Sequence, residues 1–269
     1  MDKIDIIIQG GLFNAILHNT KRFINLDFVN RVIISTWEDV NIQDDILEDE
    51  SVTIIKSSYP SNCGGGNINL QIASSLNGIK AASANLVMKL RSDQQLPDHS
   101  LKTLYDFYIT HRDDKTLTYL DGTKQKSKIC IIGNGTNWPY HPQDHIFWGA
   151  KEDMLKLFDI PYKYEPVYGS QPLDGTKDMF SINTYRLRGP IYIGAQYYAK
   201  FYDEARLHLN EYPIYLQDGA PKFQEALEFS DKIKETIFIP SPRIEMFWEK
   251  YNSGYWYDAY SAQGEYYAN

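Results

Sequence analysis

Short apolar runs alternate with longer stretches of helical spacing over the first ninety residues, and this alternation constrains the fold more than any other feature. The apolar runs lie at residues 3–9, 31–36, 51–56 and 85–91. Their Ile, Val and Leu content is typical of strands buried on both faces. Residues 13–24 and 67–82 have apolar residues at helical spacing. This order predicts an α/β fold, with a mixed, mostly parallel sheet and helices on both faces.

The pattern is less regular beyond the fourth apolar run. We expect further helices at residues 98–111, 148–158 and 195–209, and further strands at 115–120 and 128–132. The last thirty residues are rich in Trp and Tyr. Such residues stack on acceptor sugars, with Trp248 and Trp256 the leading candidates, or pack an extension onto the core, or form a homodimer contact. We expect a core at residues 1–190 and an aromatic-rich C-terminal extension at 191–269, packed on the same domain.

Charge and composition exclude several classes of protein. The formal net charge is −8, and no basic tract is longer than two residues. A nucleic-acid partner is therefore not expected, because it would require a concentrated Lys and Arg surface. No stretch approaches the roughly 20 apolar residues of a membrane span, and the N-terminal apolar run is too short for a signal peptide. Cys63 and Cys130 lie far apart, which predicts neither a disulfide framework nor a zinc site. We expect a cytoplasmic protein.

Polar side chains follow the first two predicted strands, where open α/β sheets bind their ligands. The first strand ends at Gln9, Gly10 and Gly11. Glycines there let a nucleotide base or ribose approach the backbone, although an ordinary strand-ending turn explains them equally well. The second strand ends at Thr36, Trp37 and Glu38, which offer one ring for stacking and two polar groups for hydrogen bonds.

Asp93 follows the fourth predicted strand and is the first candidate for a metal ligand and catalytic residue. A carboxylate at this edge can hold Mn²⁺ or Mg²⁺ against a diphosphate and neutralise the leaving group. Lys89 and Arg91, on the same strand, add cationic groups suited to phosphate. The alternative is that Asp93 only begins a turn before Pro97.

Asp144 is the first candidate for a general base, which must accept the proton of an attacking hydroxyl. His141 and His145 lie beside it, in a spacing that matches no zinc signature. The alternative is that Asp144 caps the N-terminus of the apolar segment after it. Fallback candidates for the base are Glu152, Asp153 and Glu165.

Four motifs, taken in order and spacing, resemble the WavE lipopolysaccharide-synthesis family. They are Ile8-Gln9-Gly10, Asn67-x-Asn69-x-Gln71, Lys89-x-Arg91-Ser92-Asp93 and His141-Pro142-x-Asp144-x-x-Phe147-Trp148-Gly149, and Asp153–Pro161 extends the match. The resemblance implies a GT-A fold that transfers a sugar from a nucleotide diphosphate to a hydroxyl of a glycan or lipid-linked saccharide. It adds Asn69, Gln71 and Ser92 to the donor side, and His141, His145, Trp148 and Gln196 to the acceptor side.

The sequence departs from the GT-A pattern at one position. Many GT-A enzymes have two aspartates spaced by one residue, and Arg91 occupies the first of these positions, whereas Asp93 corresponds to the last. Metal dependence is therefore open, because Lys89 and Arg91 offset phosphate charge in place of a cation or beside it. The one carboxylate candidate suggests an inverting transfer. Two alternatives are a nucleotidyltransferase that makes the sugar nucleotide, and a degenerate GT-A domain that binds saccharide without catalysis.

Overall fold

The computed structural model describes residues 2–42, 45–64, 67–112, 116–132, 138–163, 189–216, 219–249, 253–257 and 265–267. A seven-stranded sheet runs through its centre in the order β3-β2-β1-β4-β7-β6-β8. The strands are β1 (Ile4–Gln9), β2 (Val29–Trp37), β3 (Val52–Ser57), β4 (Leu86–Arg91), β6 (Ile129–Ile131), β7 (Ile146–Ala150) and β8 (Phe238–Pro240). The first four pair in parallel, and β6 pairs in parallel with β8. β7 runs antiparallel to both neighbours. The prediction of a mixed, mostly parallel α/β sheet is confirmed.

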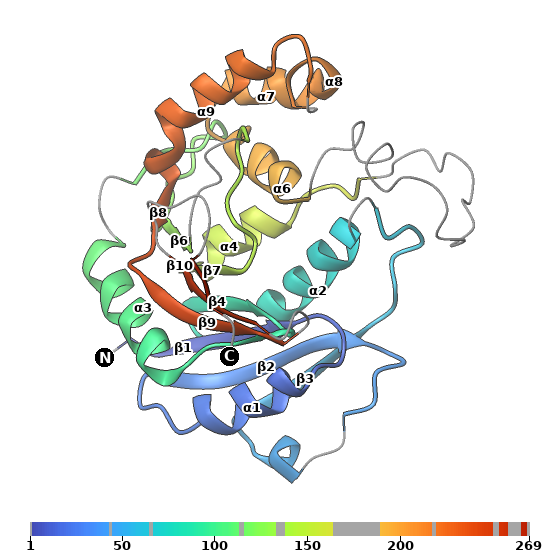
Figure 1. The fold of residues 1–269 in the computed structure, drawn as a ribbon, viewed down its shortest axis with the longest axis vertical. Coiled ribbons are helices and arrows are strands. Elements are labelled where there is room, and N and C mark those ends of the chain that lie inside the picture. Colours follow the sequence, from blue (N-terminus) through green and yellow to red (C-terminus); the bar gives the residue numbers. More distant parts are fainter. Residues whose placement is uncertain are drawn as a thin grey trace.

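Helices cover both faces of this sheet because its strands are apolar on both sides. Ile4, Ile6 and Ile8 of β1 face a core shared with α1 (Asn14–Phe23) and α3 (Asp98–His111). Ile7 faces the opposite core, which contains α2 (Ile68–Ala81) and α4 (Lys151–Phe158). In Figure 1, α1 lies below β2 and β3, and α2 lies above them.

Gly78 allows α2 to lie against β1. A Cβ added to Gly78 would come within 2.4 Å of Cγ2 of Ile7 and 3.0 Å of Cβ of Ser35. These distances are below van der Waals contact, so only a glycine permits this approach. The expectation that small residues bring this helix close to the sheet is met at this position.

A second, antiparallel sheet meets the end of β4. Its order is β11-β10-β9-β5, with β5 (Gln94–Gln95), β9 (Ile244–Trp248), β10 (Ser253–Tyr257) and β11 (Glu265–Tyr267). Because β5 begins three residues after β4 ends, its pairing with β9 brings the C-terminal part of the chain onto the polar edge of the main sheet.

Further helices gather at the top of Figure 1, beyond α4. They are α6 (Gly189–Tyr198), α7 (Asp203–Asn210), α8 (Tyr212–Tyr215) and α9 (Phe223–Ile237), and a short 3₁₀ turn lies at Asp45–Glu48. Among the described residues, no helix combines the length and apolar character needed to cross a bilayer.

Three local predictions are wrong. Residues 195–209 form parts of two helices, since α6 ends at Tyr198 and α7 begins at Asp203. The segment 148–158 is a strand end followed by α4. Residues 116–120 contain an isolated bridge between Thr118 and Lys124, not a strand. The division of the chain at residue 190 stays a prediction; α6 crosses that point and β8 joins the main sheet.

Candidate active site

A cavity of about 440 Å³ opens at the polar edge of the main sheet. It lies where β1, β2 and β4 end, and it is closed by the first turns of α2, the residue pair before β7, and the end of β9. The residues that line it are Gln9, Gly10, Gly11, Phe13, Trp37, Asn67, Leu70, Gln71, Ser74, Arg91, Ser92, Asp93, Asp144 and Trp248. The structure therefore brings both predicted catalytic carboxylates into one cavity.

The two glycines after β1 have different roles. Gly10 has φ +131°, and a Cβ there would lie 2.5 Å from Oγ of Ser92. Glycine is thus required at position 10 by the backbone conformation and by the neighbouring Ser92, which directly follows β4. Among the described residues, none comes within 4 Å of the position that a Cβ on Gly11 would take. Open space beside the backbone is therefore found at Gly11, which leaves room there for a ligand.

Asp93 is held by charge and by hydrogen bonds. Its side chain is only 5% exposed, and it accepts hydrogen bonds from Nε of Arg91 at 3.0 Å and Nη2 of Arg91 at 2.8 Å. Nε1 of Trp248 donates a third, at 2.8 Å. The Arg91 guanidinium lies 5.1 Å from the centre of the Trp248 ring, so it is stacked as well as paired. Trp248 thus closes the cavity by binding its central ion pair.

Asp144 lies on the other side of the same guanidinium. Oδ2 of Asp144 is 3.7 Å from Nη1 of Arg91, and its side chain is 17% exposed. The backbone carbonyl of Asp144 accepts a hydrogen bond from Nζ of Lys89 at 2.7 Å, and one from Nε2 of Gln71 at 3.5 Å. Arg91 therefore sits between two carboxylates, and Lys89 fixes the backbone that carries the second one.

Burial and charge set the protonation states around Arg91. Burial acts to raise the pKa of Asp93, but the hydrogen bonds and charge of Arg91, together with Trp248, outweigh it and lower that pKa. Burial likewise opposes ionisation of Asp144, and the positive charges near it, on His145 when protonated and on Arg91, lower its pKa. Both carboxyls are therefore ionised at neutral pH.

The pKa values of Lys89 and His145 are lowered as well, but for these basic side chains a lower pKa favours the neutral form. Burial lowers the pKa of Lys89 to about 7, against the attraction of Asp144. Burial also lowers the pKa of His145 to about 4. His145 contacts Nε2 of Gln94 through its Nδ1, and its ring lies edge-on to Trp248 with centroids 4.9 Å apart. His145 is therefore neutral at neutral pH and supports the wall behind Asp144.

Several predicted site residues lie outside the cavity lining. Trp148 is buried in the core and stacks on Tyr108, with centroids 5.6 Å apart. Oγ1 of Thr36 donates to the carbonyl of Gly10, which ties the ends of two strands together. Glu38 accepts a hydrogen bond from Ser58. Gln196 lines a different cavity. Ser92 and Trp37 do line the first cavity, as the residue pattern suggested.

Asn69 points away from the cavity, whereas its neighbours on the helix line it. Its buried amide bonds the backbone of Lys163 through both Nδ2, at 3.0 Å, and Oδ1, at 2.8 Å. The lining residues of this helix start are Asn67, Leu70, Gln71 and Ser74. Their spacing of three and four residues is that of one helix face. This periodicity could have identified Asn67, Leu70 and Ser74 and excluded Asn69 from the sequence alone.

The alternatives for Asp144 and its fallbacks are resolved in part. Asp144 does not cap a helix, because it precedes β7, and Ala150 is the N-cap of α4. Glu152 is exposed and lies 3.8 Å from Lys126. Asp153 is buried and accepts hydrogen bonds from Tyr119 and from the backbone of Lys126 and Ser127, so it holds a loop. His141 is partly exposed and is not among the described residues that line the cavity. Glu165 and the side chain of Trp256 lie outside the described residues.

Asp93 has limited capacity for a metal ion. A carboxylate offers about four acceptor positions, and three of those of Asp93 are taken by Arg91 and Trp248. It therefore fits a cation through one oxygen only. Within the described part of the chain, one group of three acidic or His side chains has its ligand atoms mutually close, namely Glu204, His208 and Glu225 on α7 and α9. None of those three lines the cavity.

The sequence matches the model of the WavE lipopolysaccharide synthesis family over residues 10–197, which contain Asp93, Asp144 and the start of α2. The chain belongs to the WavE family. The match covers most of the main sheet and the whole of α4, and it ends within α6. A search of curated proteins finds no match.

Comparison with solved structures gives remote likenesses. A cytidylyltransferase from Leptospira borgpetersenii is 15% identical, covers 61% of this chain and 66% of its own, and has a TM-score of 0.39. A mannosyltransferase from Pyrobaculum calidifontis, solved with GDP-Man and Mn²⁺, is 8% identical, covers 58% and 46%, and has a TM-score of 0.40. The WavE chain thus spans about two thirds of the first structure and less than half of the second. Family membership rests on the sequence match.

Proposed function

We propose that this WavE protein is a glycosyltransferase that moves a sugar from a nucleotide diphosphate to a hydroxyl of a glycan or lipid-linked saccharide. The observation that carries the proposal is the Arg91 guanidinium, held between the carboxylates of Asp93 and Asp144 in a cavity at the polar edge of the sheet. A guanidinium in that position is suited to a diphosphate, because its planar donors match phosphate oxygens.

We assign the donor one orientation in the cavity. Gly11 offers open space beside the backbone, and Trp37 lines the same side at the end of β2. We place the nucleoside there and the diphosphate at Arg91. Asp93 would hold a divalent cation through its remaining acceptor position, and that cation would add positive charge at the leaving phosphate. Lys89 donates to the carbonyl of Asp144 and lies behind this position.

Asp144 is the residue that we assign as general base. The acceptor oxygen attacks the anomeric carbon, the bond from that carbon to the phosphate oxygen breaks, and the nucleoside diphosphate leaves with the bonding electrons. The acceptor proton passes to Asp144, which is ionised at neutral pH because nearby positive charge lowers its pKa. Arg91 stabilises the negative charge of the leaving diphosphate. Attack from the face opposite the leaving group gives an inverting transfer.

Nucleotide binding and donor hydrolysis test this function. The protein is heated with UDP, GDP, CDP or dTDP, and in parallel with the corresponding triphosphates, with and without Mn²⁺. Stabilisation by one diphosphate, together with hydrolysis of its sugar conjugate, supports transfer. Stabilisation by a triphosphate, with diphosphate release from a triphosphate and a sugar phosphate, would instead identify a nucleotidyltransferase. No response to any nucleotide would leave a saccharide-binding module.

Two variants separate binding from turnover. Arg91→Met is expected to lose nucleotide binding by about tenfold or more, since it removes a charge-assisted bond to phosphate. Asp144→Asn is expected to keep nucleotide binding and to lose about 100-fold or more in turnover. Asp106→Asn, an exposed carboxylate on α3 paired with Lys102, is the matched control and should change neither property. Normal turnover in Asp144→Asn would refute its role as base.

A further inference from the structure

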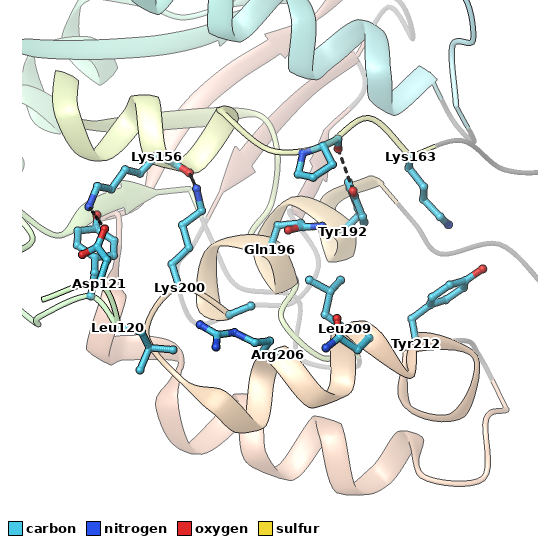
Figure 2. A pocket seen from close by; sticks show the side chains of 14 residues that line it. Leu120, Asp121, Lys156, Lys163, Tyr192, Gln196, Lys200, Arg206, Leu209 and Tyr212 are labelled. Carbon is cyan, nitrogen blue, oxygen red and sulfur yellow. Dashed lines mark hydrogen bonds and ion pairs between the residues drawn. The ribbon is translucent and has the colours of Figure 1, made fainter. Parts of the chain in front are cut away.

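A second cavity, of about 770 Å³, lies between α4, α6 and α7 (Figure 2). It shares no lining residue with the first cavity. Its volume falls within the range of about 300–1,000 Å³ that is typical of small-molecule sites. The proposed transfer chemistry uses none of its residues, so its composition requires a separate explanation.

Its charge is opposite to that of the chain. Of the fourteen described residues that line the cavity, four are Lys or Arg and one is Asp, although the chain as a whole has a net charge of −8. Three separate parts of the fold supply these cations: α4 and the residues after it, the turn that follows α6, and α7. Like charges gathered from separate elements repel one another, so an anionic ligand between them is favoured electrostatically.

Lys156 and Lys200 are held by contacts with the loop beside α4 and with the end of α4. Nζ of Lys156 lies 3.3 Å from Oδ2 of Asp121 and 3.6 Å from the centre of the Tyr119 ring. Nζ of Lys200 donates to the carbonyls of Lys156, at 2.6 Å, and Asp159, at 3.3 Å. These bonds place a positive charge at the C-terminal end of α4, where the helix dipole favours it. Lys156 and Lys200 therefore build one wall of the cavity.

Lys163 and Arg206 place positive charge on two other sides of the cavity. Lys163 is only 9% exposed, and its Nζ lies 5.1 Å from the centre of the Tyr212 ring. Arg206 is half exposed and lies 3.3 Å from the exposed Asp203. Figure 2 shows Lys163 with Tyr212 on one side of the cavity and Arg206 with Lys200 on the other. The two charged sides suit a ligand longer than a single phosphate.

The surface between the charged sides is aromatic, apolar and amide-bearing. Figure 2 shows Tyr192 and Gln196 of α6 between them, with Leu209 of α7 nearby. The hydroxyl of Tyr192 donates to the carbonyl of Pro161 at 2.8 Å, which fixes its ring. Rings and aliphatic groups pack against the apolar faces of sugars, and an amide binds their hydroxyls.

We propose that this second cavity binds an anionic saccharide, a short sugar chain bearing phosphate or carboxylate groups. This proposal names the chemical class of the acceptor in the proposed transfer. Only the statement that the ligand is an acceptor rests on the proposed function; binding of the ligand does not. The start of α2 links the two cavities, since Asn69 bonds the backbone of Lys163, which lines the second cavity, while Asn67 and Leu70 line the first. The ligand thus binds beside the transfer site.

Calorimetry with a synthetic trisaccharide carrying one phosphate monoester tests the proposal directly. The matched probes are the same trisaccharide without phosphate, and inorganic phosphate alone. We expect the phosphorylated trisaccharide to bind about tenfold more tightly than either probe, because both its charge and its rings are recognised. Equal binding of the neutral trisaccharide, or of phosphate alone, would overturn the proposal.

Variants locate the binding. Lys163→Met combined with Arg206→Gln removes two charges, and Lys232→Met removes one exposed charge on α9, outside the lining, as the control. We expect about a tenfold loss for the double variant and no change for the control. If the double variant fails to fold, Arg206→Gln alone is measured, since its side chain is half exposed. Unchanged affinity in the folded variants would overturn the proposal.

Trisaccharide binding in the second cavity should not depend on nucleotide binding in the first. Arg91→Met, which is designed to disrupt nucleotide binding, should leave trisaccharide binding intact, and the double variant should leave nucleotide binding intact. If the wild-type protein binds nucleotide but does not bind the trisaccharide, the second site is refuted and the proposed transfer is unaffected. Competition between a nucleoside diphosphate and the trisaccharide in the Arg91→Met protein would also refute it, because the second cavity would then bind nucleotide.

Discussion

Replacing Asp93 by Asn removes one charge from the centre of the first cavity while keeping the side-chain shape. The carboxylate of Asp93 accepts two hydrogen bonds from Arg91 and one from Trp248. An amide has one oxygen, and its NH₂ group cannot accept a bond. At least one of the three donors would therefore face another donor in Asp93→Asn, and the Arg91 charge would lose its nearest partner.

The size of the effect follows from these contacts. Breaking a buried ion pair typically costs about 3–5 kcal/mol, and each hydrogen bond to a charged group contributes about 1.5–3 kcal/mol. Arg91 is 24% exposed and keeps Asp144 at 3.7 Å, so solvent and the second carboxylate reduce the cost. We therefore expect Asp93→Asn to lower the free energy of unfolding by about 2–3 kcal/mol at pH 7.

Urea unfolding of wild type and Asp93→Asn as a function of pH measures this loss. The folded-state pKa of Asp93 is lowered, so its stabilisation is present above the unfolded pKa and disappears as the pH falls through the folded value. The difference between the two proteins should therefore shrink in acid. Equal stability at pH 7, or a difference that does not shrink in acid, would refute the reasoning. Asp106→Asn is the control.

Two other predictions concern Lys89 and the glycines. The pKa of Lys89 in the fold is about 7, below its ordinary 10.5, so the unfolded chain binds more protons than the folded protein between these two pH values. The free energy of unfolding should therefore rise with pH in this range. Lys89→Met should remove this rise, and parallel curves of unfolding free energy against pH for the two proteins would contradict it. Gly78→Ala should lower the free energy of unfolding by about 1–3 kcal/mol, because its Cβ would overlap Ile7. Gly11→Ala, in open space, should leave the stability unchanged but weaken nucleotide binding. Thermal unfolding with and without nucleotide measures both effects.

The parallel half of the sheet was predictable because its signal is local. Each of β1 to β4 is a short run of apolar residues, and the predicted spans agree with the observed strands to within about two residues. A run of residues that is apolar on both faces is recognisable without its neighbours. The polar residues at the ends of those strands could be named for the same reason, and the cavity contains Gln9, Trp37, Arg91 and Asp93.

To decide which of two neighbouring polar residues lines the cavity, one must know which face of the helix each occupies and how deeply its side chain is buried. Asn67 and Asn69 are identical side chains two residues apart, but one lines the cavity and the other bonds a backbone segment. Trp148 lies in one of the motifs that resemble the WavE family, yet it belongs to the core with Tyr105 and Tyr108. Composition does not separate a core tryptophan from a site tryptophan, because both are large and apolar with one polar atom.

The amino-acid sequence alone determined the α/β class, the parallel strands and the polar edge that carries Asp93, since these depend on local periodicity and on where each apolar run stops. Tertiary structure decided what surrounds that edge. The pairing of β5 with β9 places Trp248 on Asp93, 155 residues away in the chain, and the packing of α4, α6 and α7 forms the second cavity. Contacts of this range leave no local pattern, because they form only where separate elements bury surface against one another.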